Sequence, residues 1–101
     1  MALAAFSPQP GGGVRIDGEL TVESVPELYR EGRRLIEQAD TELSMDLGGV
    51  ASADSGGLAL LVDWLALAEQ GGKALRLVNL PEQVRALAGL SDVLPLLTGE
   101  P

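Results

Sequence analysis

Five consecutive residues in the middle of the chain, Asp54-Ser55-Gly56-Gly57-Leu58, have the types and spacing of a binding site. They follow an aliphatic segment typical of a buried strand, and they begin the most apolar helical segment of the chain. A serine directly after an aspartate at a helix start places its hydroxyl beside backbone N–H groups that have no partner within the helix. Such groups receive a phosphate or a polar group of a partner. The two glycines remove side chains from the same place, so the motif predicts a docking site with Ser55 at its centre.

The residues that would turn this serine into a catalyst are missing from the sequence. The chain has no His and no Cys, so Ser55 has no activating partner and the usual metal ligands are absent. Asp46 and Asp54 could in principle form a carboxylate pair or bind a divalent cation, but nothing else converges on them in sequence. A small hydrolase that acts through Ser55 or the aspartates is a remote alternative. We expect a protein that is not an enzyme and has no catalytic residue, cofactor or metal.

Size and charge narrow the class of protein further. The 101 residues, 46% of them hydrophobic, are enough for one domain that spans residues 1–101. A net charge of −8 repels nucleic acid and anionic lipid, so we expect neither a nucleic-acid partner nor direct membrane insertion. The longest apolar segment, residues 56–68, contains Asp63 and is shorter than the roughly 20 residues of a membrane-spanning helix. The absence of Cys suits a reducing compartment, and the cytoplasm is the default location.

Strand-like and helix-like segments alternate along the chain. Ser24 and Pro26 are typical of a helix start, Gly71 and Gly72 of a helix end, and Pro81 of another helix start. Alternating aliphatic residues predict strands, and Pro95 predicts that the last of them lies at a sheet edge. The predicted elements are a loose hairpin of residues 2–6 and 14–17, a helix from 24 to 38, a strand at 43–49, a helix at 55–70, a strand at 73–78, a helix from 81 to 89 and an edge strand at 93–97.

This order of elements predicts an α/β fold. Strands that alternate with helices through tight connections imply parallel crossovers, and the hairpin adds antiparallel pairing at one side. We therefore expect a mixed sheet of about five strands. Three helices are too few to cover both faces of such a sheet, so we place the helices mainly on one face and expect the other to be partly exposed.

The same order, together with its motifs, resembles the STAS domain, the fold of anti-sigma-factor antagonists. The motifs are Asp17-Gly18-Glu19-Leu20-Thr21 before the first helix, the segment from Asp54 to Leu58, and the strand, helix and closing strand of the C-terminal half. The resemblance covers nearly the whole chain. Two positions depart from the family pattern, because Thr21 stands where the family usually has Asp and Gly56 where it more often has Ser or Ala.

Within that family, the sequence is most similar to the MlaB-type STAS subunit of the phospholipid-transport ABC system. The similarity lies in the run from Gly57 to Val62, in Leu80-Pro81-Glu82, and in an end soon after Leu97, where longer antagonists continue into a further C-terminal helix. It implies a non-catalytic cytoplasmic subunit that binds the ATPase of an ABC-type lipid-asymmetry (Mla) transporter and supports its assembly or activity. Such a subunit lies at the inner membrane only through its partner.

The resemblance also implies an alternative, an anti-sigma-factor antagonist that binds an anti-sigma kinase. In such antagonists the serine that matches Ser55 is phosphorylated by the partner kinase, and the modified form releases its partner. A phosphate adds a charge of about −1.5 to −2, which beside Asp54 would repel an acidic partner surface. In both interpretations Ser55 is an interface residue, and whether it is phosphorylated stays open.

Each residue of the motif also has a plainer interpretation. Asp54 or Ser55 could simply cap the helix, and the glycines could merely permit close packing of the helix on the sheet. Trp64 is expected in the core, as a lone aromatic on an apolar helix face. Leu60 and Leu67 flank that face and are candidates for a ridge facing the partner, unless the neighbouring helix buries them. The predicted partner-binding residues are Asp54, Ser55, Gly56, Gly57, Leu58, Leu60 and Leu67.

Overall fold

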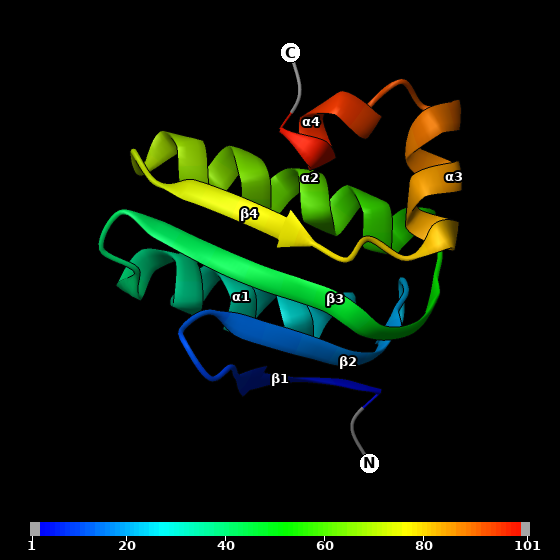
Figure 1. Cartoon of the computed structure of the whole chain (residues 1–101). Helices are drawn as coiled ribbons and strands as arrows, with labels where there is room; N and C mark the ends of the chain where they lie inside the picture. Colours follow the sequence, from blue (N-terminus) through cyan, green and yellow to red (C-terminus); the bar gives the residue numbers. More distant parts are fainter. Residues whose placement is uncertain (1–2, 100–101) are drawn as a thin grey trace.

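The computed structural model describes residues 3–99. Its elements are β1 (Ala4–Pro8), β2 (Val14–Leu20), α1 (Val25–Gln38), β3 (Glu42–Ala53), α2 (Ser55–Gln70), β4 (Ala74–Val78), α3 (Glu82–Leu90) and α4 (Leu94–Thr98). The strands form one sheet in the order β1-β2-β3-β4 (Figure 1). β1 and β2 form an antiparallel hairpin, whereas β2, β3 and β4 run parallel to one another. The predicted α/β class with a mixed sheet is therefore confirmed.

The predicted fifth strand at residues 93–97 is wrong, because this segment forms the short helix α4. Pro95 lies in the first turn of that helix, where a missing N–H costs no hydrogen bond. Packing favours the helix, since α4 contacts α2, α3 and β4 and buries Leu97. The described part of the chain thus closes with a helix beyond the β4 edge (Figure 1). The argument for the MlaB-type similarity from an end soon after Leu97 took residues 93–97 as a strand, and this part of its premise is not met.

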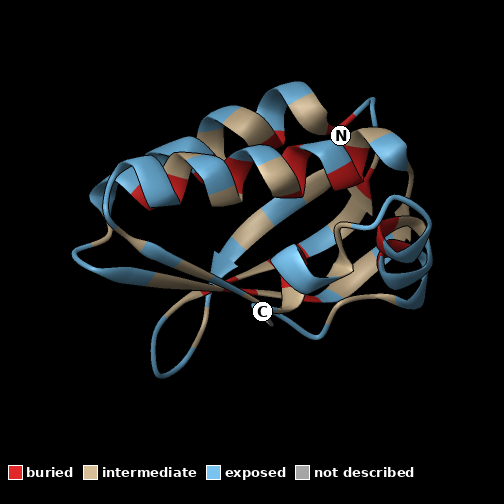
Figure 2. Cartoon of the chain, turned by 90° about the horizontal axis from the view of Figure 1, so that it is seen from above, coloured by how far each residue is buried: buried red, intermediate tan, exposed pale blue. Residues whose placement is uncertain are grey.

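The core lies between one face of the sheet and the helices α1 and α2, which run side by side over that face (Figure 2). Alternate residues of β3, such as Met45 and Leu47, are buried beneath them. Trp64 of α2 is 0% exposed, so its predicted place in the core is confirmed. A Cβ atom on Gly32 of α1 would lie 2.3 Å from the Trp64 ring, which shows how closely the two helices approach there.

The opposite face of the sheet is polar and carries ion pairs. In β2, the Arg15 Nε lies 2.9 Å from an Asp17 carboxylate oxygen, and the Arg15 Nη1 lies 3.7 Å from a carboxylate oxygen of Asp46 in β3. In β4, the Arg76 Nε lies 3.8 Å from a carboxylate oxygen of Glu42. These residues alternate with the buried ones, as the two-residue period of a strand requires. α3 and α4 lie at the end and the edge of the sheet (Figure 1). No helix within residues 3–99 is long and apolar enough to cross a lipid bilayer.

Candidate functional site

The segment singled out in the sequence lies at the edge of the sheet where the parallel strands end. β2, β3 and β4 all point their carboxyl ends to this edge, and α1, α2 and α3 begin there (Figure 1). Ligands of open α/β sheets commonly bind at such an edge, because loops and helix starts meet there. The start of α2 at Ser55 follows β3 after a single residue, Asp54, so a rigid strand and a rigid helix hold the site from both sides.

Asp54 joins the start of α2 to the loop between β2 and α1. It is the N-cap residue of α2, and its carboxylate accepts a hydrogen bond from the Gly57 N–H at 3.1 Å. The same carboxylate accepts the Val22 N–H, at 3.1 Å from one oxygen and 3.2 Å from the other. The Asp54 N–H in turn donates to the Leu20 carbonyl at 3.2 Å. The plainer interpretation of Asp54 as a helix cap is therefore confirmed, and the cap also fixes a second loop.

These hydrogen bonds predict a pH-dependent contribution of Asp54 to stability. The Val22 N–H, and after it the Gly57 N–H, lower the pKa of Asp54 from its ordinary value of 3.8. A lowered pKa in the folded state means that the stabilisation is fully present above the pKa of the unfolded chain and is lost as the pH falls through the folded pKa. Below that pH both states are protonated and the contribution is gone.

We therefore expect Asp54→Asn to lower the free energy of unfolding at pH 7 and to have a smaller effect at pH 3, which lies below the ordinary carboxyl pKa of 3.8. Urea denaturation of both proteins at both pH values measures this. Other carboxyls with lowered pKa values, such as Asp46 and Glu31, are present in both proteins and cancel in the difference. An equal effect of the substitution at both pH values would show that the charge of Asp54 has no part in the cap.

Ser55 is the first residue of α2, and its side chain is exposed. Within residues 3–99 its hydroxyl makes no hydrogen bond, because Asp54 rather than Ser55 supplies the cap. Beside it stands Val22, a hydrophobic residue that is 62% exposed and lies against Gly56. The surface at the start of α2 therefore presents a free hydroxyl, an ionised carboxylate and an apolar side chain.

The two glycines of the motif have different surroundings. Gly57 is buried, and a Cβ atom there would lie 1.9 Å from the carbonyl oxygen of Leu20, so only glycine allows α2 to start this close to β2. A Cβ atom on Gly56 would lie 3.0 Å from both Cα and Cβ of Val22, a tight contact that a small movement of the loop relieves. The packing interpretation thus applies most strongly to Gly57.

Comparison with known proteins identifies the family. The sequence model of the family described as "Mlab, STAS domain" matches residues 6–98. The chain belongs to the STAS domain family. The anti-sigma-B factor antagonist of Staphylococcus epidermidis is 30% identical over 89 residues, which cover 85% of this chain and 82% of the relative. The same protein from the strain ATCC 12228 matches equally well.

Solved structures with the same fold include two of SpoIIAA. The anti-sigma factor antagonist SpoIIAA in its unphosphorylated form has a TM-score of 0.69 and 22% identity, and the match covers 91% of this chain and 83% of that one. The Bacillus cell fate determinant SpoIIAA in the phosphorylated form has a TM-score of 0.68 and 20% identity, and the match covers 97% and 90%. At these identities the likeness establishes the fold, which agrees with the STAS resemblance of the sequence.

Three leucines expected in the binding surface of the STAS domain lie elsewhere. Leu58 is 6% exposed and Leu60 is 3% exposed, and both belong to the core. Leu60 is therefore not part of an exposed ridge, because α2 packs against three strands and against α1, α3 and α4, which widens its buried arc. Leu67 is half-buried and lines a shallow hollow beside Tyr29 and Gln70. The residues of the motif with surface at the start of α2 are Asp54, Ser55 and Gly56.

Two further residues lie at the candidate site without any local signal in the sequence. Val22 is one of them, because nothing in its neighbourhood along the chain marks it as a neighbour of α2. Gln83 lies in the first turn of α3 and its Oε1 accepts the Ala53 N–H at 2.9 Å, so it holds the end of β3 directly before Asp54. Both contacts join residues about 30 positions apart, and no local sequence signal reports them.

Asp46 takes no part in this site. It lies in β3 eight residues before Asp54, which at the rise of a strand is roughly 25 Å. Its carboxylate accepts hydrogen bonds from Asn79 Nδ2 at 3.0 Å and the Gly48 N–H at 2.8 Å, and these lower its pKa. A carboxylate pair of Asp46 and Asp54 is therefore excluded by distance. In the part of the chain that the structure describes, no group of three or more acidic residues is placed to hold a metal ion.

Proposed function

We propose that this STAS domain is a non-catalytic binding module that docks one partner protein at the start of α2. The observation that carries the proposal is the exposed hydroxyl of Ser55, which the cap at Asp54 leaves free. The Asp54 carboxylate is already engaged by the N–H groups of Val22 and Gly57, so it is poorly placed to serve as a base for Ser55. A free hydroxyl without a base is suited to recognition and not to hydrolysis.

We propose further that the module is an antagonist of an anti-sigma factor and that phosphorylation of Ser55 releases the partner. The support is the relative named anti-sigma-B factor antagonist and the match of the fold to SpoIIAA in both its unphosphorylated and phosphorylated forms. A phosphate on Ser55 would lie at a helix N-terminus, whose N–H groups and dipole favour an anion, so the fold can keep its shape. The same phosphate would add about −1.5 to −2 to a surface that already carries the Asp54 charge. Phosphorylation therefore changes the docking surface and leaves the scaffold as it is.

A second candidate is a subunit that binds the ATPase of an ABC-type phospholipid transporter. Its support is the description of the matching family, "Mlab, STAS domain". In this role Ser55 is a constant contact and is not modified. Both candidates use the same surface, so they differ in the partner and in the chemistry at Ser55.

Capture of the native partner on the immobilised full chain distinguishes them. Proteins retained from native lysate are identified and then incubated with radiolabelled ATP and the free domain. The first candidate predicts recovery of a protein kinase that labels the wild type and the Ser91→Ala variant but not Ser55→Ala. Ser91 is a fair control because it is an exposed serine at the C-terminal end of α3.

Other outcomes are equally informative. Recovery of an ABC transporter ATPase, without labelling of Ser55, would favour the second candidate and contradict the first. Equal retention of the same partner by wild type and by a Ser55→Glu variant would contradict docking at the start of α2. Turnover of simple esters or phosphate monoesters that is lost in Ser55→Ala would contradict a non-catalytic role.

A further inference from the structure

β1 is an edge strand, and no strand within residues 3–99 pairs with its outer side. In an antiparallel pair, alternate residues turn their N–H and C=O groups toward the neighbouring strand. The Leu3 carbonyl accepts the Glu19 N–H of β2 at 3.0 Å, so Leu3 and every second residue after it direct their backbone N–H and C=O groups toward β2. The backbone groups that point away from β2 are therefore those of Ala4, Phe6 and Pro8. Ala4 and Phe6 offer a donor and an acceptor each, and Pro8 offers only an acceptor, so this edge is a template for one more strand.

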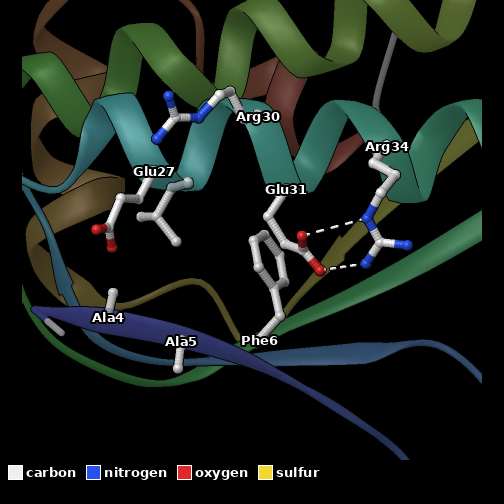
Figure 3. A pocket seen from close by; sticks show the side chains of 8 residues that line it. Ala4, Ala5, Phe6, Glu27, Arg30, Glu31 and Arg34 are labelled. Carbon is white, nitrogen blue, oxygen red and sulfur yellow. Dashed lines mark hydrogen bonds and ion pairs between the residues drawn. The ribbon is translucent and has the colours of Figure 1, made fainter.

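A groove follows this edge between β1 and α1 (Figure 3). Its central part has a volume of about 450 Å³, with Phe6 and Leu28 among its lining residues. Hollows of about 400 and 250 Å³ continue it in both directions, since each shares lining residues with the central part. We call this feature the β1–α1 groove and define it by Ala4, Phe6, Glu27, Arg30, Glu31 and Arg34.

The helix side of the β1–α1 groove carries a self-complementary charge pattern. Glu27, Arg30, Glu31 and Arg34 are spaced three, four and seven residues apart, so they lie on one face of α1. Glu31 pairs with Arg34 in the chain, whereas Glu27 and Arg30 form no salt bridge within residues 3–99. The order of charges is negative, positive, negative, positive. An antiparallel copy of the helix would place Glu27 opposite Arg34 and Arg30 opposite Glu31.

We propose that the occupant of the β1–α1 groove is β1 of a second copy of this chain, in a two-fold symmetric dimer. The two β1 strands pair antiparallel about Phe6, so the Phe6 N–H donates to the Phe6 carbonyl of the other copy and the Ala4 N–H to its Pro8 carbonyl. The charge pattern of α1 has its centre between Arg30 and Glu31, and Phe6 lies beneath Glu31 (Figure 3). A single two-fold axis thus pairs the two β1 edges through backbone hydrogen bonds and also places opposite charges of the two α1 helices across from each other. A self-complementary two-fold interface requires both.

The dimer leaves the start of α2 accessible. β1 forms one side edge of the sheet, whereas α2 begins at the end where the parallel strands finish (Figure 1). The inference therefore does not depend on the function proposed for Ser55.

Sedimentation equilibrium of the full chain and of charge variants tests the dimer. Arg30→Glu places a carboxylate opposite Glu31 of the second copy at two symmetric positions, and we expect it to raise the dimer dissociation constant about tenfold or more. Adding Glu31→Arg to this variant restores opposite charges across the axis and should restore most of the affinity. Arg33→Glu is the matched control, because it makes the same charge change on α1 at an exposed residue that pairs with Glu37 outside the groove.

Hydrogen exchange gives a second measurement on the unmodified protein. The amides of Ala4 and Phe6 should be protected at concentrations above the dissociation constant and exchange rapidly on dilution, whereas the Ala5 amide faces β2 and should be protected throughout. A chain that stays monomeric up to about 1 mM would overturn the proposal. So would a dimer in which Arg30→Glu behaves like Arg33→Glu, or in which the Phe6 amide stays unprotected.

Discussion

Replacing Ser55 by glutamate is expected to weaken partner binding by about 100-fold or more, because a carboxylate buried in an interface without an opposite charge beside it costs several kcal/mol. The new carboxylate would stand at the exposed start of α2 beside Asp54, whose pKa is lowered by the N–H groups of Val22 and Gly57. Two adjacent negative charges would then meet a partner surface that accepts a neutral hydroxyl. The fold should be unaffected, because the side chain is exposed and an acidic residue in the first turn of a helix is favourable.

Titration calorimetry against the purified partner measures this effect. Ser55→Gln is the matched variant, because it has the size of glutamate without its charge. We expect Ser55→Gln to retain more affinity than Ser55→Glu, and Ser55→Ala to lose the least. Equal losses of affinity in the glutamine and glutamate variants would show that the effect comes from the size of the side chain and not from its charge. Near-normal affinity of Ser55→Glu, with an unchanged melting temperature, would remove Ser55 from the interface.

Replacing Gly57 by alanine is expected to be the most destabilising single-methyl change at the site. The added Cβ would lie 1.9 Å from the Leu20 carbonyl oxygen and 2.7 Å from its carbonyl carbon. β2 cannot move away easily, because it is paired with β1 on one side and β3 on the other. Overpacking of this kind costs about 3 kcal/mol, which in a domain of this size lowers the melting temperature by roughly 10–20 °C.

Gly89 provides the matched control for that experiment. It lies in α3, is exposed, and has no atom within 4 Å of the position that a Cβ would take. Gly89→Ala should therefore raise stability by up to about 1 kcal/mol, the difference in helix propensity between the two residues. Thermal unfolding followed by circular dichroism compares the two variants. A Gly57→Ala protein that melts with the wild type would mean that α2 starts farther from β2 than the structure places it.

Several elements could be predicted because their signals are local. Ser24 precedes α1 and Pro26 lies in its first turn, Gly71 ends α2, and Pro81 precedes α3, as predicted. The short segment at residues 93–97 had no such signal. Pro95 is compatible with an edge strand and with the first turn of a helix, and five residues are too few for a periodicity to separate the two. The contacts of α4 with α2 and β4 favour the helix, and no local pattern reports them.

The same distinction holds for the site. The start of a helix after Asp54, with a serine and two glycines at its beginning, can be predicted from local residues, because caps and glycines act on their immediate neighbours. Which residue forms the cap and which has a free side chain depends on contacts between distant segments. Asp54 is held by the Val22 N–H as well as by Gly57, and Val22 lies 32 residues away in sequence. Burial of Leu60 was likewise decided by the elements around α2. Hydrogen bonds and packing between distant segments exist only once the chain has folded, and they leave Ser55 as the exposed hydroxyl of the site.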